Sequence, residues 1–303
     1  MARVCGVPTT RSDFSGPGDL SEMQAMCSRV WSPRARFHPG QLAWNWYSQR
    51  VAPDRMGADE AISLWRVGDE VVGFGWAEST DWLELHVDPD HPEVADDVVD
   101  WFEDWSDAPR QSAVAMEGDS VEPVLREAGF RPDRDGWHFT HHLLDLRELP
   151  PVPQVAGYRL RPVGQGEAAP RAAVHRAAWS EFGPSRVSAE AYAQVMQARP
   201  YRSGLDWVAG DREGRMVASV IVWLDDATGV ALVEPVGCEP GHRRRGLAGA
   251  VTLAALHRSR ELGAHTAQVS PRGDDDYPGP RRLYQALGFR PVARTVTWSR
   301  SLD

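Results

Sequence analysis

Hydrophobic and polar positions follow the same coarse order twice along this chain of 303 residues. Each half has two stretches of helical spacing, paired β-prone runs, a further helix, a strand, and a short helix that ends in Gly-Phe. In the first half the β-prone runs are residues 62–67, 71–77 and 82–87. This order indicates an internal repeat. We therefore predict an α/β (α+β) fold of two tandem units, each with a mixed, mostly antiparallel central sheet flanked by helices.

The second half shows the pattern in more detail. Two β-prone runs flank the polar turn Asp211-Arg212-Glu213-Gly214, which predicts a β-hairpin. An alanine-rich stretch before them has helical spacing. The predicted strands are 158–162, 207–209, 217–224 and 230–238, and the predicted helices are 166–179 and 189–196.

A proline-rich segment separates the two halves. Residues 149–155 contain three prolines and no apolar periodicity, which is typical of a stiff, extended connector. We therefore expect a first domain at 1–148, a linker at 149–156 and a second domain at 157–303.

Charge is distributed unequally between the halves. Residues 1–156 carry 13 arginines against 28 acidic residues, a net charge of −15, whereas residues 157–303 carry 20 arginines against 15, a net charge of +5. A mildly basic half attracts a phosphorylated ligand, while an acidic half repels polyanions. The total of −10 argues against nucleic acid as a partner.

Composition places the chain in a broad class. The hydrophobic content is 42%, and no stretch is long and apolar enough to cross a membrane. The start, Met1–Cys5, lacks the features of a secretory signal, so we expect a cytoplasmic protein. Cys5, Cys27 and Cys238 are far apart, which favours neither a disulfide framework nor a zinc site.

One segment combines a strand, a turn and a helix in an order that suits phosphate binding. Residues 230–238 predict an apolar strand, and helical spacing then runs from 247 until Gly263. A helix N-terminus offers unpaired N–H groups and a partial positive charge, which suit a pyrophosphate. Small residues let the backbone approach the phosphates, and arginines add charge. The predicted phosphate-binding residues are Arg243, Arg244, Arg245, Gly246, Leu247 and Ala248.

The pattern Arg243-x-x-Gly246-x-Ala248 resembles the R/Q-x-x-G-x-G/A loop of the GNAT N-acetyltransferase superfamily. The strand before it, the helix after it, and the L-Y-x-x-x-G-F segment at 283–289 make the resemblance more specific. Elements that match the superfamily cover residues 157–303, and the tandem plan is similar to two-domain actinobacterial enzymes of the mycothiol synthase type. The resemblance implies GNAT-like domains, of which the second is catalytic.

The resemblance also implies a chemistry. Acetyl-CoA would be the co-substrate, and its acetyl group would pass directly to a small-molecule amine in a ternary complex. Main-chain groups of Val236, Gly237 and Cys238 would line the pantetheine arm. Tyr284 stands where relatives have the acid that protonates the CoA thiolate, although it is equally consistent with a packed core aromatic. Glu234 stands where relatives have the base, although it is also consistent with a structural or substrate-anchoring acid.

Acceptor residues are less clearly marked. Trp179, Phe182 and Tyr201 lie where the resemblance places the border of the acceptor site, and the alternative for each is the hydrophobic core. Glu181 and Asp206 are candidates for attracting a cationic amine.

The first half reads as a degenerate copy. At the positions of Arg243, Gly246 and Ala248 it has Pro92, Ala95 and Asp97. The close-approach glycine is therefore missing, and acids would face the pyrophosphate. Leu125 replaces the tyrosine of the L-Y segment. We expect no CoA binding here by the usual mode. This half could still shape the acceptor cleft or form a dimer, and an exposed group among its aromatics would favour a homodimer. These aromatics are Trp31, Trp44, Trp46 and Tyr47.

Two further features favour no metal. The acidic run Asp274–Asp276 lies in a Gly/Pro-rich stretch that is typical of a solvated loop, and Tyr277 follows it where the superfamily often has asparagine. His138 and His142 share one face of a strand, but the sequence offers no complete ligand set beside them. Two other functions stay open: an acyl-CoA-binding sensor or scaffold with little turnover, and a protein N-terminal or lysine acetyltransferase.

Overall fold

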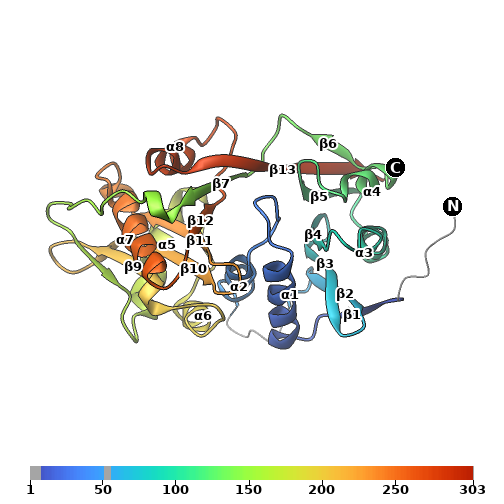
Figure 1. Cartoon of the computed structure of the whole chain (residues 1–303), viewed down its shortest axis with the longest axis horizontal. Coiled ribbons are helices and arrows are strands. Elements are labelled where there is room, and N and C mark those ends of the chain that lie inside the picture. The colour runs from blue at the N-terminus through green and yellow to red at the C-terminus, as the bar shows by residue number, and fades with distance from the viewer. Residues whose placement is uncertain (1–7, 51–55, 303) are drawn as a thin grey trace.

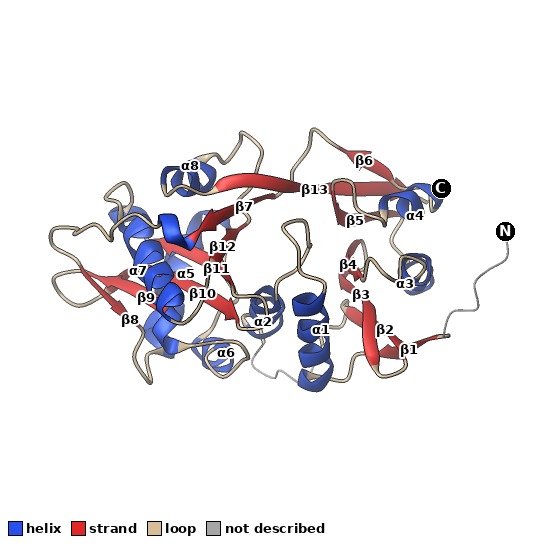
Figure 2. Cartoon of the chain, viewed as in Figure 1, coloured by secondary structure: helices blue, strands red, loops and turns tan. Residues whose placement is uncertain are grey.

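The structure, a computed structural model, describes residues 8–50 and 56–302 (Figure 1). Met1–Cys5, including the cysteine considered above, lies outside the described residues. Within this part of the chain, the strands join in one hydrogen-bonded sheet with the order β1-β2-β3-β4-β5-β13-β7-β12-β11-β10-β9-β8, and β6 also pairs with β13. The mixed, mostly antiparallel sheet flanked by helices confirms the predicted fold class (Figure 2).

The first half contains the three strands that were predicted from the alternation pattern, now β2, β3 and β4, and they pair antiparallel. β4 pairs with β5 in parallel across helix α3. The elements are β1 (Thr9–Asp13), α1 (Pro17–Arg29), α2 (Pro39–Tyr47), β2 (Ala61–Val67), β3 (Glu70–Ser79), β4 (Trp82–Val87), α3 (Val94–Trp105), β5 (Arg110–Met116), α4 (Glu122–Glu127), β6 (Arg131–Asp133) and β7 (Thr140–Asp145).

The second half repeats this order, and every predicted strand and helix in it is present. The predicted hairpin is β9 and β10, joined at the turn Asp211–Gly214. The elements are β8 (Arg159–Pro162), α5 (Ala168–Trp179), α6 (Ala189–Val195), β9 (Asp206–Gly210), β10 (Met216–Asp225), β11 (Val230–Cys238), α7 (Leu247–Glu261), β12 (Thr266–Val269), α8 (Gly279–Ala286) and β13 (Arg290–Ser301).

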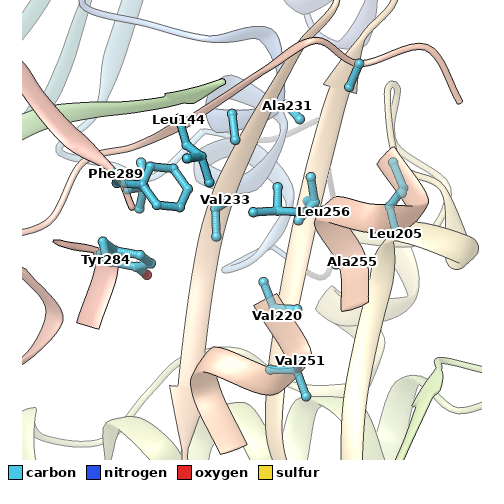
Figure 3. Close-up of a cluster of buried hydrophobic side chains, with 14 of the residues drawn as sticks. Leu144, Leu205, Val220, Ala231, Val233, Val251, Ala255, Leu256, Tyr284 and Phe289 are labelled. Carbon is cyan, nitrogen blue, oxygen red and sulfur yellow. The ribbon is translucent and has the colours of Figure 1, made fainter. Parts of the chain in front are cut away.

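β10 is buried along its whole length because helices cover both of its faces. Val220 and Val222 pack toward Val251 of α7, in the core cluster that Figure 3 shows. Ile221 and Trp223 point to the other face, where they pack with residues of α2, α5 and α6. The strand therefore shows a continuous apolar run, as expected for a strand covered on both sides.

The two halves exchange their last strands. β7, which precedes the linker, pairs antiparallel with β12 of the second half. β13, at the end of the chain, pairs with β7 and then continues along β5 of the first half (Figure 1). Its 12 residues are long enough to pair with strands of the first half on both sides, and its register with β7 shifts between Pro291 and Ala293. The single sheet therefore contains strands from both sides of the linker expected at 149–156. The domain boundary at this linker stays a prediction.

The aromatic residues near position 44 pack inside the chain. Trp46 is buried in the first-half core, and Trp44 and Tyr47 pack against the cluster around Trp223 of the second half. They form no exposed aromatic group in the described residues, so a homodimer gains no support from them and stays a prediction. Among residues 8–50 and 56–302, no helix has the length and apolarity needed to cross a membrane.

Candidate active site

A β-bulge opens the sheet of the second half. Two residues of β11, Glu234 and Pro235, lie opposite the single residue Ile221 of β10. The parallel pairing of β11 with β12 ends at Leu232, before the bulge. In the first half, β3 and β4 pair without a shift between Gly73 and Ala77, so this part of the copy has no equivalent bulge. The bulge therefore distinguishes β11 from β4 over this part of the described chain.

Main-chain groups beyond the bulge point into this gap. The N–H of Glu239 donates to Val217 O of β10 at 2.8 Å. Because successive residues of a strand direct their N–H groups to opposite sides, the N–H groups of Val236 and Cys238 point away from β10. The Cys238 carbonyl follows this alternation, since it accepts from Arg243 Nε at 3.1 Å.

A cavity of about 700 Å³ occupies the gap and extends to the first half. Most of the residues predicted to react or to contact ligands line it: Trp179, Phe182, Glu234, Val236, Gly237, Cys238, Arg243 and Tyr284. Arg244 to Ala248 lie just beyond it, in the loop and first turn of α7.

Glu234 and Tyr284 face this cavity from β11 and α8. Trp223 Nε1 donates to the Glu234 carbonyl at 2.6 Å and fixes the backbone of the bulge. Burial raises the pKa of Glu234 to about 7, and the positive charge of Arg36 acts in the opposite direction. Burial and the charge of Glu234 raise the pKa of the Tyr284 hydroxyl well above its ordinary value. Near neutral pH, Glu234 can therefore accept a proton while Tyr284 keeps its own.

Arg243 ties the end of α5 to β11. Its guanidinium donates to Ala178 O at 2.9 Å and pairs with Glu181 at 2.5 Å, in addition to its bond to Cys238. Glu181 is thus engaged by an arginine of the loop, and the idea that it attracts an amine is not supported. Arg243 holds the wall of the cavity, which leaves Arg244 and Arg245 as the more exposed cations of the loop.

The loop before α7 has the backbone of an anion-binding turn. Arg244 has φ 64° and Gly246 has φ 81°, the left-handed conformation that glycine adopts without strain. α7 begins at Leu247, and no described side chain caps its first turn. The first N–H groups of a helix have no partner inside it, so they are available to a phosphate here.

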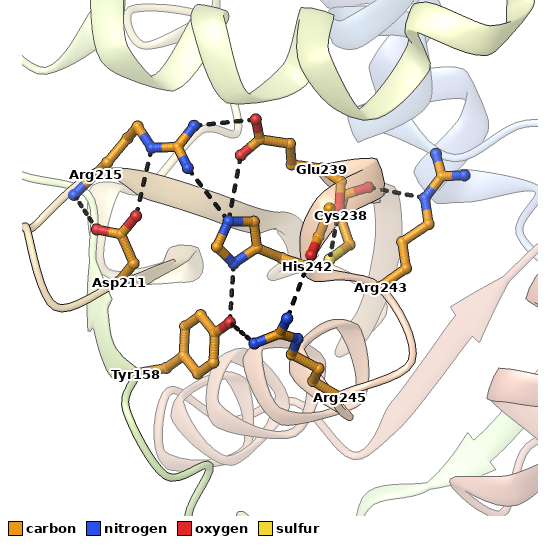
Figure 4. Close-up of polar contacts among 9 residues, drawn as sticks. Tyr158, Asp211, Arg215, Cys238, Glu239, His242, Arg243 and Arg245 are labelled. Atoms are coloured by element: carbon orange, nitrogen blue, oxygen red, sulfur yellow. Dashed lines mark hydrogen bonds and ion pairs between the residues drawn. The ribbon is translucent and has the colours of Figure 1, made fainter.

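A hydrogen-bonded network holds this loop (Figure 4). Arg215 donates to His242 Nε2 at 3.2 Å, so the other ring nitrogen, Nδ1, carries the proton and donates to Tyr158 Oη at 2.8 Å. The same tyrosine oxygen accepts from Arg245 at 2.9 Å. Arg215 also pairs with Glu239 at 3.0 Å. These contacts within the chain hold the conformation of the loop.

An aromatic pair spans the outer part of the cavity. Phe182 is 58% exposed, and its ring meets Tyr277 edge to face with 5.2 Å between centroids. Tyr277 occupies the position where the superfamily often has asparagine, and it lines the cavity.

Two residues predicted near the acceptor have another role. Tyr201 is not among the residues that line the cavity, and Asp206 is fully buried. Asp206 accepts from Arg171 Nε at 2.8 Å and from the hydroxyls of Tyr192 and Tyr201 at 2.5 and 3.1 Å. A buried carboxylate requires such partners, so this group anchors α5 and α6 to β9 and is closed to an amine.

The first half supplies cavity residues that sequence reasoning missed. Trp44, Ser48, Gln49 and Phe139 line the cavity from α2, the segment after it, and the segment before β7. His175 of α5 lies between Trp44 and Trp179, at 5.2 and 4.3 Å between ring centroids. The density of tryptophan near residue 44 was the available signal, but no motif linked it to the second half.

The acidic run before α8 is balanced by arginine. Arg272 pairs with Asp274 at 2.6 Å, and Arg281 pairs with Asp275 at 2.6 Å. Within the described ranges, no group of three His, Cys, Asp or Glu side chains could hold a metal ion.

Comparison with known proteins agrees with this geometry. Residues 171–289, from α5 to α8, match the model of the acetyltransferase (GNAT) family. The segment from α5 to α8 is thus similar to GNAT domains, and the chain as a whole has the fold of a tandem GNAT protein.

Individual relatives extend the match. The chain is 31% identical over 189 residues to mycothiol acetyltransferase of Beutenbergia cavernae, and the match covers 56% of this chain and 60% of that protein. A tandem GNAT protein from the clavulanic acid biosynthesis pathway superposes with a TM-score of 0.62 at 16% identity, over 98% of this chain and 99% of the other. A GCN5-related N-acetyltransferase from Sphaerobacter thermophilus gives 0.61 at 16% identity, over 97% and 96%. At this identity the two structures show the fold alone.

Proposed function

We propose that the protein is an acetyl-CoA-dependent N-acetyltransferase that acts on a small-molecule amine in the cytoplasm. One observation carries this proposal: a single cavity joins the splayed strand β11, the Arg243 side of the phosphate loop, and the pair Glu234 and Tyr284. The family of residues 171–289 and the printed activity of the Beutenbergia relative support it.

The residues present fit acetyl-CoA. The start of α7 and the left-handed turn at Gly246 form a concave backbone surface for the pyrophosphate, and a Cβ on Gly246 would be strained by its φ of 81°. Arg244 and Arg245 add positive charge beside it. Val236 and Cys238 would pair with the pantetheine arm as a strand would. Bound there, acetyl-CoA supplies an activated acetyl group at the bulge.

The chain's own groups then perform the transfer. Glu234 takes the proton from the attacking amine, and the new N–C bond forms as the C–S bond breaks. The N–H of Val236 or Cys238 donates to the carbonyl oxygen as it gains charge. Tyr284 gives its proton to the departing sulfur. No acyl-enzyme is required, because amine and thioester meet in one cavity.

The acceptor wall favours a small molecule with an apolar face. Trp44, His175 and Trp179 form a continuous aromatic surface beside Glu234. Burial and two arginines, Arg171 and Arg176, lower the pKa of His175 to about 3, so this imidazole is neutral at working pH and does not repel a cationic amine. A cavity shared by both halves limits the length of acceptor that can enter.

The test is release of CoA from acetyl-CoA across a panel of small amines. We expect turnover with at least one amine, a loss of kcat of about 10²-fold or more in Glu234→Gln, and a smaller loss in Tyr284→Phe. Binding of acetyl-CoA without turnover on any amine would favour the sensor. Unchanged kcat in both variants would refute the assigned roles.

A further inference from the structure

The loop between α5 and α6 forms part of the cavity wall. Residues 183–187 of this loop all line the cavity. The chain directly after Arg186 is held in place, because Arg176 of α5 donates to Val187 O at 2.7 Å and the Val187 side chain is buried. Ser188 then caps α6 by accepting from the backbone of that helix at 3.1 Å. The backbone that carries Arg186 is therefore fixed at the edge of the cavity.

Three arginines of the described residues line the cavity, and one of them has no partner. Arg243 pairs with Glu181 at 2.5 Å, and Arg272 pairs with Asp274 at 2.6 Å. Arg186 is exposed, and in the part of the chain that the structure describes it forms no hydrogen bond or ion pair. The cavity thus presents one cation that no carboxylate among these residues neutralises.

Arg186 and the phosphate loop belong to helices on opposite faces of the sheet. The core clusters place α2, α5 and α6 on one face of β10, and α7 on the other. The phosphate loop leads into α7, whereas the loop with Arg186 joins α5 to α6. The pyrophosphate at the start of α7 already has Arg244 and Arg245 beside it. Arg186 is therefore the cation left for the other ligand of the cavity.

His175 of α5 offers a further polar atom to that ligand. Its side chain is only 6% exposed and lines the cavity between Trp44 and Trp179. Nδ1 is fully buried and has no hydrogen-bond partner among the described residues. Nε2 has no partner there either but is not fully buried, so it is the ring nitrogen that is open to the cavity. A neutral imidazole can place its one proton on Nε2 and donate it to a ligand oxygen.

We propose that the acceptor is an amine that also carries an oxyanion, a carboxylate or a phosphate, which Arg186 binds while the amino group lies at Glu234. This rests on the proposed function, because Glu234 is the proposed base. The guanidinium presents parallel N–H groups that match either oxyanion. His175 Nε2 donates a further hydrogen bond, and the rings of Trp44 and Trp179 cover the apolar part of the acceptor.

The experiment compares matched pairs of amines that differ in the oxyanion, with the full chain and saturating acetyl-CoA. The pairs are phenylalanine with phenethylamine, tryptophan with tryptamine, and glucosamine 6-phosphate with glucosamine. We expect kcat/KM for the anionic member of at least one pair to exceed that of its neutral partner about tenfold or more. The pair that shows this preference tells a carboxylate from a phosphate. Equal or higher kcat/KM for the neutral member of every active pair would overturn the inference.

Variants at Arg186 test which residue produces the preference. Arg186→Gln should lower the ratio of kcat/KM between the anionic and neutral members at least about tenfold, mainly through the KM of the anionic one. Arg186→Lys keeps the charge and should retain part of the ratio, and Arg186→Glu should reverse it. A purely structural role would lower both members alike and leave the ratio at its wild-type value, which would contradict the proposal.

Two controls separate the acceptor from the co-substrate and from general charge. Arg212→Gln removes an exposed arginine in the turn between β9 and β10 that does not line the cavity, and it should keep the wild-type ratio. The KM for acetyl-CoA is measured in Arg186→Gln as well. A rise in that KM with an unchanged acceptor ratio would assign Arg186 to CoA and overturn the inference.

Binding decides the inference even if no amine is acetylated, an outcome that would refute only the proposed function. Isothermal titration calorimetry of the same pairs is then carried out on the full chain saturated with CoA. We expect the anionic member of a pair to bind at least about tenfold more tightly than its partner, and Arg186→Gln to remove this difference. Absence of such a difference in every pair would overturn the inference.

Discussion

At the scale of single residues, the site depends on glycines, which allow close packing, as much as on the residues with reactive side chains. Gly237 lies where the end of α5 crosses β11. A Cβ there would stand 2.2 Å from Trp179 Cζ3 and 2.7 Å from Ala178 Cβ. The close approach places Trp179 in the cavity wall and lets Arg243 reach Ala178 O.

Gly237→Ala is expected to destabilise the fold by about 1–3 kcal/mol, because the added methyl group must displace a packed indole. It should also raise the KM of the acceptor, since Trp179 forms part of that wall. Urea unfolding and steady-state kinetics measure the two effects. Gly241→Ala is the matched control, because a Cβ at that position meets no atom within 4 Å. A Gly237→Ala protein as stable as this control would contradict the packing argument.

The site could be predicted in part from the sequence. Glu234 and Tyr284 were suggested by the resemblance to the GNAT superfamily, and both line one cavity in the structure. The place of Trp44 and Phe139 in the cavity could not be found this way, because their partners are far away in the chain and hydrophobic spacing gives no information on such contacts. Asp206 shows the converse: its charge suggested a ligand, but burial among Arg171 and two tyrosines makes it structural.

At the scale of elements, the two copies differ in one strand and one helix start. β11 has a bulge opposite Ile221 and a gap beside it, whereas β4 pairs with β3 without a shift from Gly73 to Ala77. After β4, Asp88 accepts from Asp90 N and pairs with Arg29, so a carboxylate of the chain itself holds the turn before α3. The sequence alone was sufficient to predict this difference. A helix start with glycine and arginine can bind phosphate, whereas one with proline and aspartate cannot.

Ala248→Asp tests this contrast by giving α7 the acid that α3 has at Asp97. An acid in the first turn of a helix is favourable, so the free energy of unfolding should be unchanged or slightly higher. Affinity for acetyl-CoA should fall at least about tenfold, because the carboxylate repels the pyrophosphate. Isothermal titration calorimetry and urea unfolding measure the two quantities. Wild-type affinity in this variant would show that the phosphates bind elsewhere.

At the scale of the whole molecule, the halves form one body. β7 of the first half pairs with β12, and β13 of the second half pairs with β5. Trp31 and His38, between α1 and α2, bond to β12 and β11, and the cavity takes residues from both halves. The repeat and its elements were predictable because each unit has its own hydrophobic pattern. The exchange of strands between the halves could not be predicted. A local hydrophobic pattern shows that a strand is present, but it does not show which strand it pairs with.

The central claim is that this body has one acyl-CoA site, in its second half. The most direct test is the stoichiometry of acetyl-CoA binding to the full chain by isothermal titration calorimetry. We expect one equivalent per chain, with binding reduced in Ala248→Asp. No binding, or two equivalents of similar affinity, would contradict the account.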